Sequence, residues 1–207
     1  VLDDYVGYVE AKELVSRPAK PTHIVAALRT FIYPKPDLKT RPAVPLSMNA
    51  KLKVVGARGN FSEIEGGGWV FTAHLASVGS YVRDFVSVAE EFAGVPYLWG
   101  GRDSLGLDCS GLLQLSFGEA GVTIPRSSNE QAVWGDPVKS TDLQPGDLVF
   151  FGGSPGSRTI THVGMVTVAD EEGVDFIHAS TSLGVVENSL ESDYYLSRFI
   201  RAVRPRL

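Results

Sequence analysis

The sequence changes character near Ser80, and this change divides the chain into two kinds of structure. Between about residues 20 and 78, closely spaced prolines exclude helix and mark loops or edge positions. These prolines are Pro34, Pro36, Pro42 and Pro45. Polar and apolar residues alternate over 51–55 and 61–65, which is the pattern of half-buried strands. We therefore expect a small all-β barrel over residues 20–78.

Residues from about 80 to 207 begin with helical periodicity and continue with strand patterns. Apolar residues recur at helical spacing after Ser80, which is the expected N-cap. They are Val82, Phe85, Val86, Ala89 and Phe92. A second helix is expected after Asp108, and strands are expected at 148–151, 162–168, 174–179 and 199–203. Helices followed by strands predict an α+β domain with an antiparallel sheet.

The charge and cysteine content exclude several classes of function. The chain has 19 basic and 24 acidic residues, a net charge of −5, and no basic run typical of nucleic-acid binding. Its single cysteine, Cys109, excludes an internal disulfide framework and a four-cysteine zinc site. No stretch approaches the roughly 18 apolar residues of a membrane-spanning helix. Because no signal peptide is visible, we expect a cytoplasmic location.

Cys109 has the sequence context of a nucleophile. It follows Asp108 at the start of the second expected helix, in a run rich in glycine and polar residues. Unpaired N–H groups at a helix start stabilise a thiolate, so we expect a lowered pKa for the Cys109 thiol. The backbone N–H of Cys109 could also stabilise an oxyanion. The alternative, a small buried core residue, fits these neighbours less well.

Two histidines are candidates for the base that a thiol nucleophile requires. His162 begins one expected strand and His178 ends the next, so an antiparallel hairpin through 170–173 places them side by side. One imidazole can then take the proton of the thiol, and the other can orient it and fix its tautomer. We interpret His23 and His74 as structural residues of the barrel region.

A zinc site is the competing interpretation of the same residues. Cys109, His162 and His178 could ligate zinc, and Asp175 could join them. The spacings are long and no second thiol is present, so catalysis is the better explanation.

Several motifs, taken together and in order, resemble the NlpC family of papain-like cell-wall cysteine peptidases. The resemblance covers about residues 82 to 204. The motifs are residues 96–101 (PYLWGG), 108–111 (DCSG), 125–128 (PRSS) with Gln131, 143–151 (LQPGDLVFF), 162–165 (HVGM) and 177–179 (IHA).

This resemblance implies a papain-like fold and a specific reaction. Family members hydrolyse amide bonds of peptidoglycan peptides through an acyl-enzyme, typically between γ-D-glutamate and a diamino acid. Cys109 would be the nucleophile, His162 the base and His178 the third residue of the triad. Tyr97 matches a tyrosine that lies near the oxyanion. No cofactor and no metal are expected.

The barrel resembles the SH3-like domains that accompany this family in bacteria. In a subgroup with such domains, the substrate is a freed muropeptide, L-Ala-γ-D-Glu-diamino acid, whose amine and carboxylate are held near the nucleophile. The residues that match this substrate site are Asp108, Ser110, Arg126, Ser127 and Ser128. A carboxylate suits an ammonium, and Arg126 with serine hydroxyls suits a carboxylate.

Residues 5–9, Tyr-Val-Gly-Tyr-Val, resemble the end of the barrel region. We interpret residues 1–15 as the tail of a truncated first SH3-like domain, and Tyr5 as a substrate contact. Two alternatives to the peptidase remain open: a papain-like amidase or acyltransferase acting on another amide, and a catalytically dead cell-wall-binding module.

Overall fold

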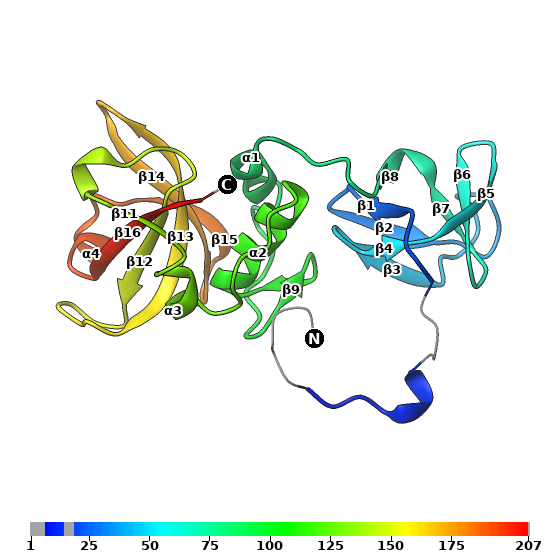
Figure 1. The fold of residues 1–207 in the computed structure, drawn as a ribbon, viewed down its shortest axis with the longest axis horizontal. Helices are drawn as coiled ribbons and strands as arrows, with labels where there is room; N and C mark the ends of the chain where they lie inside the picture. The colour runs from blue at the N-terminus through cyan, green and yellow to red at the C-terminus, as the bar shows by residue number, and fades with distance from the viewer. Residues whose placement is uncertain (1–6, 15–18, 207) are drawn as a thin grey trace. The chain divides into compact units, whose positions relative to one another are not determined.

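In a computed structural model the chain forms two compact units, residues 1–80 and residues 81–207 (Figure 1). The structure describes residues 7–14 and 19–206. Tyr5 therefore lies outside the described residues. Residues 7–9, whose sequence resembles the end of the barrel region, are not in a strand, and a short 3₁₀ turn, η1 (Ala11–Glu13), follows them. Within the described ranges, no helix has the length and apolar character needed to cross a membrane.

The first unit is built from short antiparallel strands. In the described part of this unit they form three small sheets. The sheets are β4 (Lys51–Leu52), β1 (His23–Val25) and β8 (Leu75–Ser77); β2 (Arg29–Ile32) and β3 (Val44–Ser47); and β5 (Val54–Arg58), β6 (Phe61–Ile64) and β7 (Trp69–Phe71). A 3₁₀ turn, η2 (Thr72–His74), connects β7 to β8. These elements agree with the all-β pattern of the sequence.

One strand of this unit differs from the sequence-based prediction. The single strand expected over 51–55 is divided at Lys53, because β4 pairs with β1 whereas β5 pairs with β6. Lys53 lies where the chain passes between the two sheets, and its Nζ forms an ion pair with Glu65 at 2.6 Å. An alternating pattern can identify extended residues, but it cannot identify their partners.

The second unit contains a single large antiparallel sheet among its described strands. Its order is β11 (Gly135–Val138), β16 (Phe199–Pro205), β12 (Leu148–Gly152), β13 (Ile160–Asp170), β14 (Gly173–Ser180) and β15 (Gly184–Ser189). The four strands predicted from the sequence are confirmed as β12, β13, β14 and β16, while β11 and β15 were not predicted. The smaller elements are α1 (Phe85–Glu90), β9 (Arg102–Asp103), β10 (Gly106–Leu107), α2 (Cys109–Glu119), α3 (Ser128–Gln131), η3 (Ser140–Asp142) and α4 (Asp193–Leu196).

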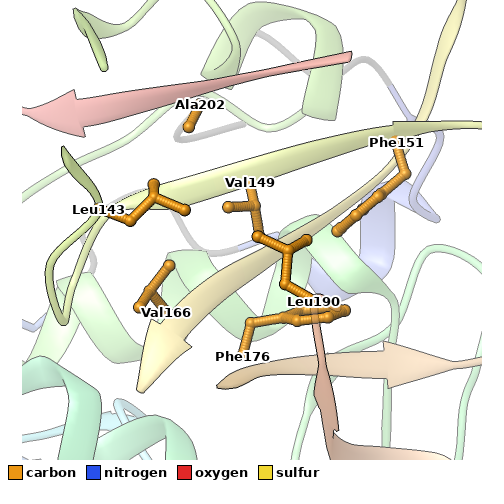
Figure 2. Packing of buried hydrophobic residues seen from close by; sticks show 7 residues of the cluster. All are labelled: Leu143, Val149, Phe151, Val166, Phe176, Leu190 and Ala202. Carbon is orange, nitrogen blue, oxygen red and sulfur yellow. The ribbon is translucent and has the colours of Figure 1, made fainter. Parts of the chain in front are cut away.

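A cluster of buried apolar side chains packs against the middle strands of this sheet (Figure 2). It consists of Leu143, Val149, Phe151, Val166, Phe176, Leu190 and Ala202. Because side chains two residues apart share one face of a strand, His178 continues the face on which Phe176 lies. The two rings stack with centroids 5.0 Å apart. The apolar core therefore extends directly to a histidine at the end of β14.

The first helix of this unit starts later than the sequence suggested. Ser80 is not its N-cap, because α1 begins only at Phe85. Asp84 caps α1 instead, and its Oδ1 accepts hydrogen bonds from the N–H groups of Val86 and Ser87, both at 3.1 Å. A carboxylate at this position satisfies two otherwise unpaired N–H groups.

Helix α2 is buried on nearly every side, and a glycine allows its first turn to approach a loop. Asp108 caps it as expected, because Asp108 Oδ1 accepts from the N–H of Gly111 at 2.7 Å. A Cβ atom at Gly111 would lie 2.3 Å from the carbonyl oxygen of Gly101. Glycine at this position therefore allows the backbones of the loop and the helix to approach closely.

We expect Gly111→Ala to lower the free energy of unfolding by about 1–3 kcal/mol, because the new methyl group has no space. Urea denaturation monitored by circular dichroism measures this change. Gly153→Ala is the control, since its Cβ would meet only Thr161 at 3.6 Å. In an unconstrained helix, alanine is more stable than glycine by up to about 1 kcal/mol. A stabilised Gly111→Ala variant would therefore contradict the close approach.

Candidate active site

Cys109 is the first residue of α2, and its side chain is buried, with 8% of the residue exposed. Backbone N–H groups of Val163, Ser110 and Cys109 itself are directed at the sulfur. Val163 follows His162 in β13. The thiol of the helix therefore lies beside the strand that carries the first candidate base.

The pKa of the Cys109 thiol differs from the sequence-based expectation. Burial is the main cause that raises this pKa to about 11, and the nearby Asp108 carboxylate also raises it. The N–H groups act in the opposite direction but do not compensate. The expectation of a lowered pKa was wrong because it considered the helix start alone, without the loss of solvent around it. At neutral pH the resting residue is a thiol.

The structure brings His162 and His178 together. Nε2 of His162 lies 2.8 Å from Nδ1 of His178, and the two rings are nearly perpendicular, at 89°. Strand β13 pairs with β14 so that Met165 lies opposite Ile177. Continuing this register places Gly164 opposite His178. The histidines are therefore diagonal neighbours across the strand pair, not the directly facing residues that a symmetric hairpin would give.

Burial keeps both imidazoles neutral. It is the main cause that lowers the pKa of His162 to about 3, and the adjacent His178 lowers it further. Burial also lowers the pKa of His178, which is 2% exposed, whereas its hydrogen bond to Asn188 raises it. Because both values lie below the ordinary value, both rings are uncharged at neutral pH. A neutral imidazole is the form that can accept a proton from a thiol.

Two residues that sequence reasoning missed lie behind His178. Its Nε2 is 3.0 Å from Asn188 Oδ1 and 3.0 Å from the hydroxyl of Tyr195. Asn188 belongs to β15 and Tyr195 to α4, and neither element was predicted. Asparagine is uncommon in strands, so the local sequence carries no signal that would have placed Asn188 there.

Asp108 and Arg126, expected to contact different ends of a substrate, pair with each other. The guanidinium donates to both carboxylate oxygens, with Nη1 3.0 Å from Oδ1, and both residues are buried. Arg126 Nη1 also donates to Ser110 Oγ at 2.8 Å. The N–H of Gly100 donates to Asp108 Oδ2 at 3.0 Å. This network fixes the cap of α2 and the loop before it.

Ser127 caps α3 in a capping box with Glu130, and Ser128 is the first residue of that helix. The N–H of Glu130 donates to Ser127 Oγ at 3.3 Å, and Ser127 Oγ donates to the Glu130 carboxylate at 2.6 Å. The hydroxyl of Ser127 is thus engaged in the cap.

Tyr97 is half-buried, and its backbone forms a bridge with Leu107, two residues before the nucleophile. Burial is the main cause that raises the pKa of its hydroxyl, and the negative charge that Cys109 carries when ionised is the next. The hydroxyl of Tyr97 therefore lies close enough to Cys109 for ionisation of the thiol to affect its pKa.

Among residues 7–14 and 19–206, no group of three or more His, Cys, Asp or Glu side chains could hold a metal ion. The four ligands considered for zinc from the sequence, Cys109, His162, His178 and Asp175, all lie within these described residues.

The chain is similar to several known sequences and structures. The model of the NlpC/P60 family matches residues 94–204. A Haemophilus influenzae protein named "Probable endopeptidase" is 41% identical over 110 residues, which are 53% of this chain and 65% of that protein. A Bacillus subtilis gamma-D-glutamyl-L-lysine dipeptidyl-peptidase is 42% identical over 83 residues, or 40% of this chain and 28% of that protein. The chain thus spans less than two thirds of both relatives.

A solved structure extends the similarity beyond the family region. The crystal structure of an NlpC/P60 family protein from Bacillus cereus has a TM-score of 0.75 and 26% identity to this chain. The match covers 89% of this chain and 63% of that chain. Because residues 81–207 are a smaller share of this chain than 89%, the match also includes part of the first unit.

We expect the thiol to react with iodoacetamide about tenfold faster for each pH unit between pH 7 and 9, because its pKa is raised to about 11. Since Cys109 is the only cysteine, mass spectrometry of the intact protein reports on this site alone. A cysteine peptide with an ordinary pKa of about 8.5 serves as the control and should level off near pH 9. A rate that is already constant below pH 7 would indicate a preformed thiolate and contradict the analysis.

Proposed function

This chain belongs to the NlpC/P60 family, and we propose that it is a cysteine endopeptidase of peptidoglycan peptides. Members of this family are cysteine peptidases that act on peptidoglycan, and relatives of this chain are named endopeptidases. We propose further that the bond cleaved joins γ-D-glutamate to a diamino acid in a peptide with a free N-terminal L-Ala. The name of the Bacillus subtilis dipeptidyl-peptidase supports this choice of bond.

The observation that carries the proposal is one thiol beside the strand that carries His162, whose ring is hydrogen-bonded to His178. Nε2 of His162 is occupied by His178, so Nδ1 of His162 is the nitrogen left to accept a proton. The thiol lies beside β13, where Val163 donates to its sulfur. These contacts support acyl transfer with Cys109 as nucleophile, His162 as base and His178 as orienting group.

In the proposed reaction, Sγ of Cys109 bonds to the carbonyl carbon while its proton passes to Nδ1 of His162. The tetrahedral intermediate collapses, the C–N bond breaks, and that proton leaves with the amine of the diamino acid. Water then attacks the thioester and gives its proton to His162, and collapse releases the γ-glutamyl carboxyl group and restores the thiol. The N–H of Cys109 and the hydroxyl of Tyr97 would stabilise the oxyanion.

For the amino end of the substrate, we propose Asp108 and Ser110 as acceptors of the α-ammonium. Arg126 already donates to both carboxylate oxygens of Asp108 and balances their charge. The substrate ammonium would therefore donate to the same carboxylate oxygens as a further hydrogen-bond donor. The hydroxyl of Ser128 completes the proposed contacts, whereas that of Ser127 is engaged in the cap of α3.

The first unit has a separate proposed identity. We propose that residues 20–78 form an SH3-like barrel; short antiparallel strands and the extended match to the Bacillus cereus structure support this. The proposed location is the cytoplasm, where a single functional cysteine stays reduced.

We expect Cys109→Ala to abolish release of diaminopimelate from L-Ala-γ-D-Glu-diaminopimelate, and His162→Ala to reduce it roughly 10²- to 10⁴-fold, the range of a general base. Liquid chromatography with mass spectrometry measures the release, and circular dichroism checks that each variant is folded. Turnover only with an added acceptor amine would identify an acyltransferase. Binding of the tripeptide without release would identify a binding module.

We expect acetylation of the N-terminal alanine to reduce kcat/KM about 10- to 150-fold, because one charge-assisted contact of about 1.5–3 kcal/mol is lost. The comparison uses free and acetylated tripeptides with the same enzyme preparation. Equal rates would exclude recognition of the ammonium and favour an enzyme that acts within intact wall.

A further inference from the structure

We propose that Asn188 and Tyr195 are positioning residues that hold His178, and through it His162, in the proton arrangement that general-base catalysis requires. This inference rests on the proposed function, because it concerns the same pair of histidines. It adds two residues from elements outside the helix and strands that carry the triad.

The three side chains form a closed triangle of polar contacts. His178 Nε2 lies 3.0 Å from Asn188 Oδ1 and 3.0 Å from the hydroxyl of Tyr195, and this hydroxyl donates to the same Oδ1 at 3.1 Å. His178 is 2% exposed, and the other two side chains are half-buried. Water has little access to the histidine, so these contacts determine its hydrogen-bonding state.

Counting protons in the triangle assigns the tautomer of His178. The tyrosine hydroxyl has one proton, and it is donated to Asn188 Oδ1. A carbonyl oxygen only accepts, so an unprotonated Nε2 at 3.0 Å from it would place two lone pairs against each other. Nε2 of His178 must therefore carry a hydrogen, and Nδ1 of the same ring must be an acceptor.

This assignment passes to His162 through the 2.8 Å contact between the rings. Because Nδ1 of His178 accepts, Nε2 of His162 must donate. A neutral imidazole has one N–H, so Nδ1 of His162 keeps its lone pair. This is the nitrogen that the proposed reaction needs as a base.

The opposite tautomer would disable the site without moving an atom of the backbone. If His178 carried its hydrogen on Nδ1, it would donate to Nε2 of His162. The hydrogen of His162 would then lie on Nδ1, and that nitrogen could not accept the proton of the thiol. A wrong tautomer with intact geometry is a known way to lose general-base catalysis.

Packing holds Tyr195 in place independently of its hydroxyl. Its ring centroid lies 5.3 Å from that of Phe151 and 4.8 Å from that of Phe176. Both phenylalanines belong to the apolar cluster of Figure 2. Replacing Tyr195 by phenylalanine therefore removes one hydroxyl and preserves the ring contacts.

The first test measures the tautomers directly in the unmodified protein. Two-bond ¹H–¹⁵N spectra of protein labelled with ¹⁵N-histidine distinguish Nδ1–H from Nε2–H, and His162→Gln and His178→Gln identify the signals. We expect hydrogens on Nε2 of both rings at pH 7. A hydrogen on Nδ1 of His178 would overturn the inference. The measurement needs no substrate, so its result is separate from the success of the proposed function.

The second test uses paired variants of Asn188. Asn188→Leu removes the acceptor at similar size, and we expect His178 to lose its single tautomer and kcat to fall about 10- to 100-fold, with KM within about twofold. Asn188→Asp retains an acceptor oxygen, and we expect it to restore the tautomer and most of kcat. Equal losses in both variants, or an unchanged tautomer in Asn188→Leu, would overturn the inference.

Tyr195→Phe completes the series. We expect a fall in kcat smaller than that of Asn188→Leu, because Asn188 remains as acceptor. Tyr194→Phe is the matched control, since it removes a neighbouring exposed hydroxyl, and it should retain the activity of the unmodified protein. Thermal melting of every variant shows whether the variant has lost stability. If kcat falls only in those variants whose melting temperature also falls, the positioning role is contradicted.

Discussion

The antiparallel register of β13 and β14 is the constraint on which the candidate site depends. It places Gly164 opposite His178, and a Cβ atom at Gly164 would lie 2.5 Å from the ring of Phe176. That ring stacks on His178. The same pairing brings the ring of His162 diagonally onto His178. Slipping the register by one residue would move these side chains to the other face of the sheet, so core packing and chemistry are specified together.

Burial determines the charge state of the site at rest. It raises the pKa of the Cys109 thiol and lowers that of His162, so both reacting groups are neutral before substrate binds. The charged pair closest to the nucleophile, Asp108 with Arg126, is satisfied internally and holds the start of α2. In such an arrangement, charge on the thiol and on His162 develops only when the thiol attacks the substrate. Backbone N–H groups and the histidine pair can stabilise that charge.

The sequence allowed much of the second unit to be predicted, and its omissions share a cause. The helix after Asp108 and four strands have strong local signals, in caps, turns and apolar runs. Strand β15 contains Glu187 and Asn188 and was missed because its extended form comes from pairing with β14. The start of α1 was misplaced because Ser80 and Asp84 are both acceptable caps, and only the surrounding structure distinguishes them.

The sequence by itself determined the residue types of the chemistry: one thiol at a capped helix start and two histidines at strand ends. These depend on local rules of capping and alternation, which act over a few residues. Only the tertiary structure decided the protonation of these groups and the partners behind them. The pKa of the thiol depends on solvent removed by distant segments, and the triangle around His178 joins residues from β14, β15 and α4. Such contacts arise from packing between elements, and no short stretch of sequence encodes them.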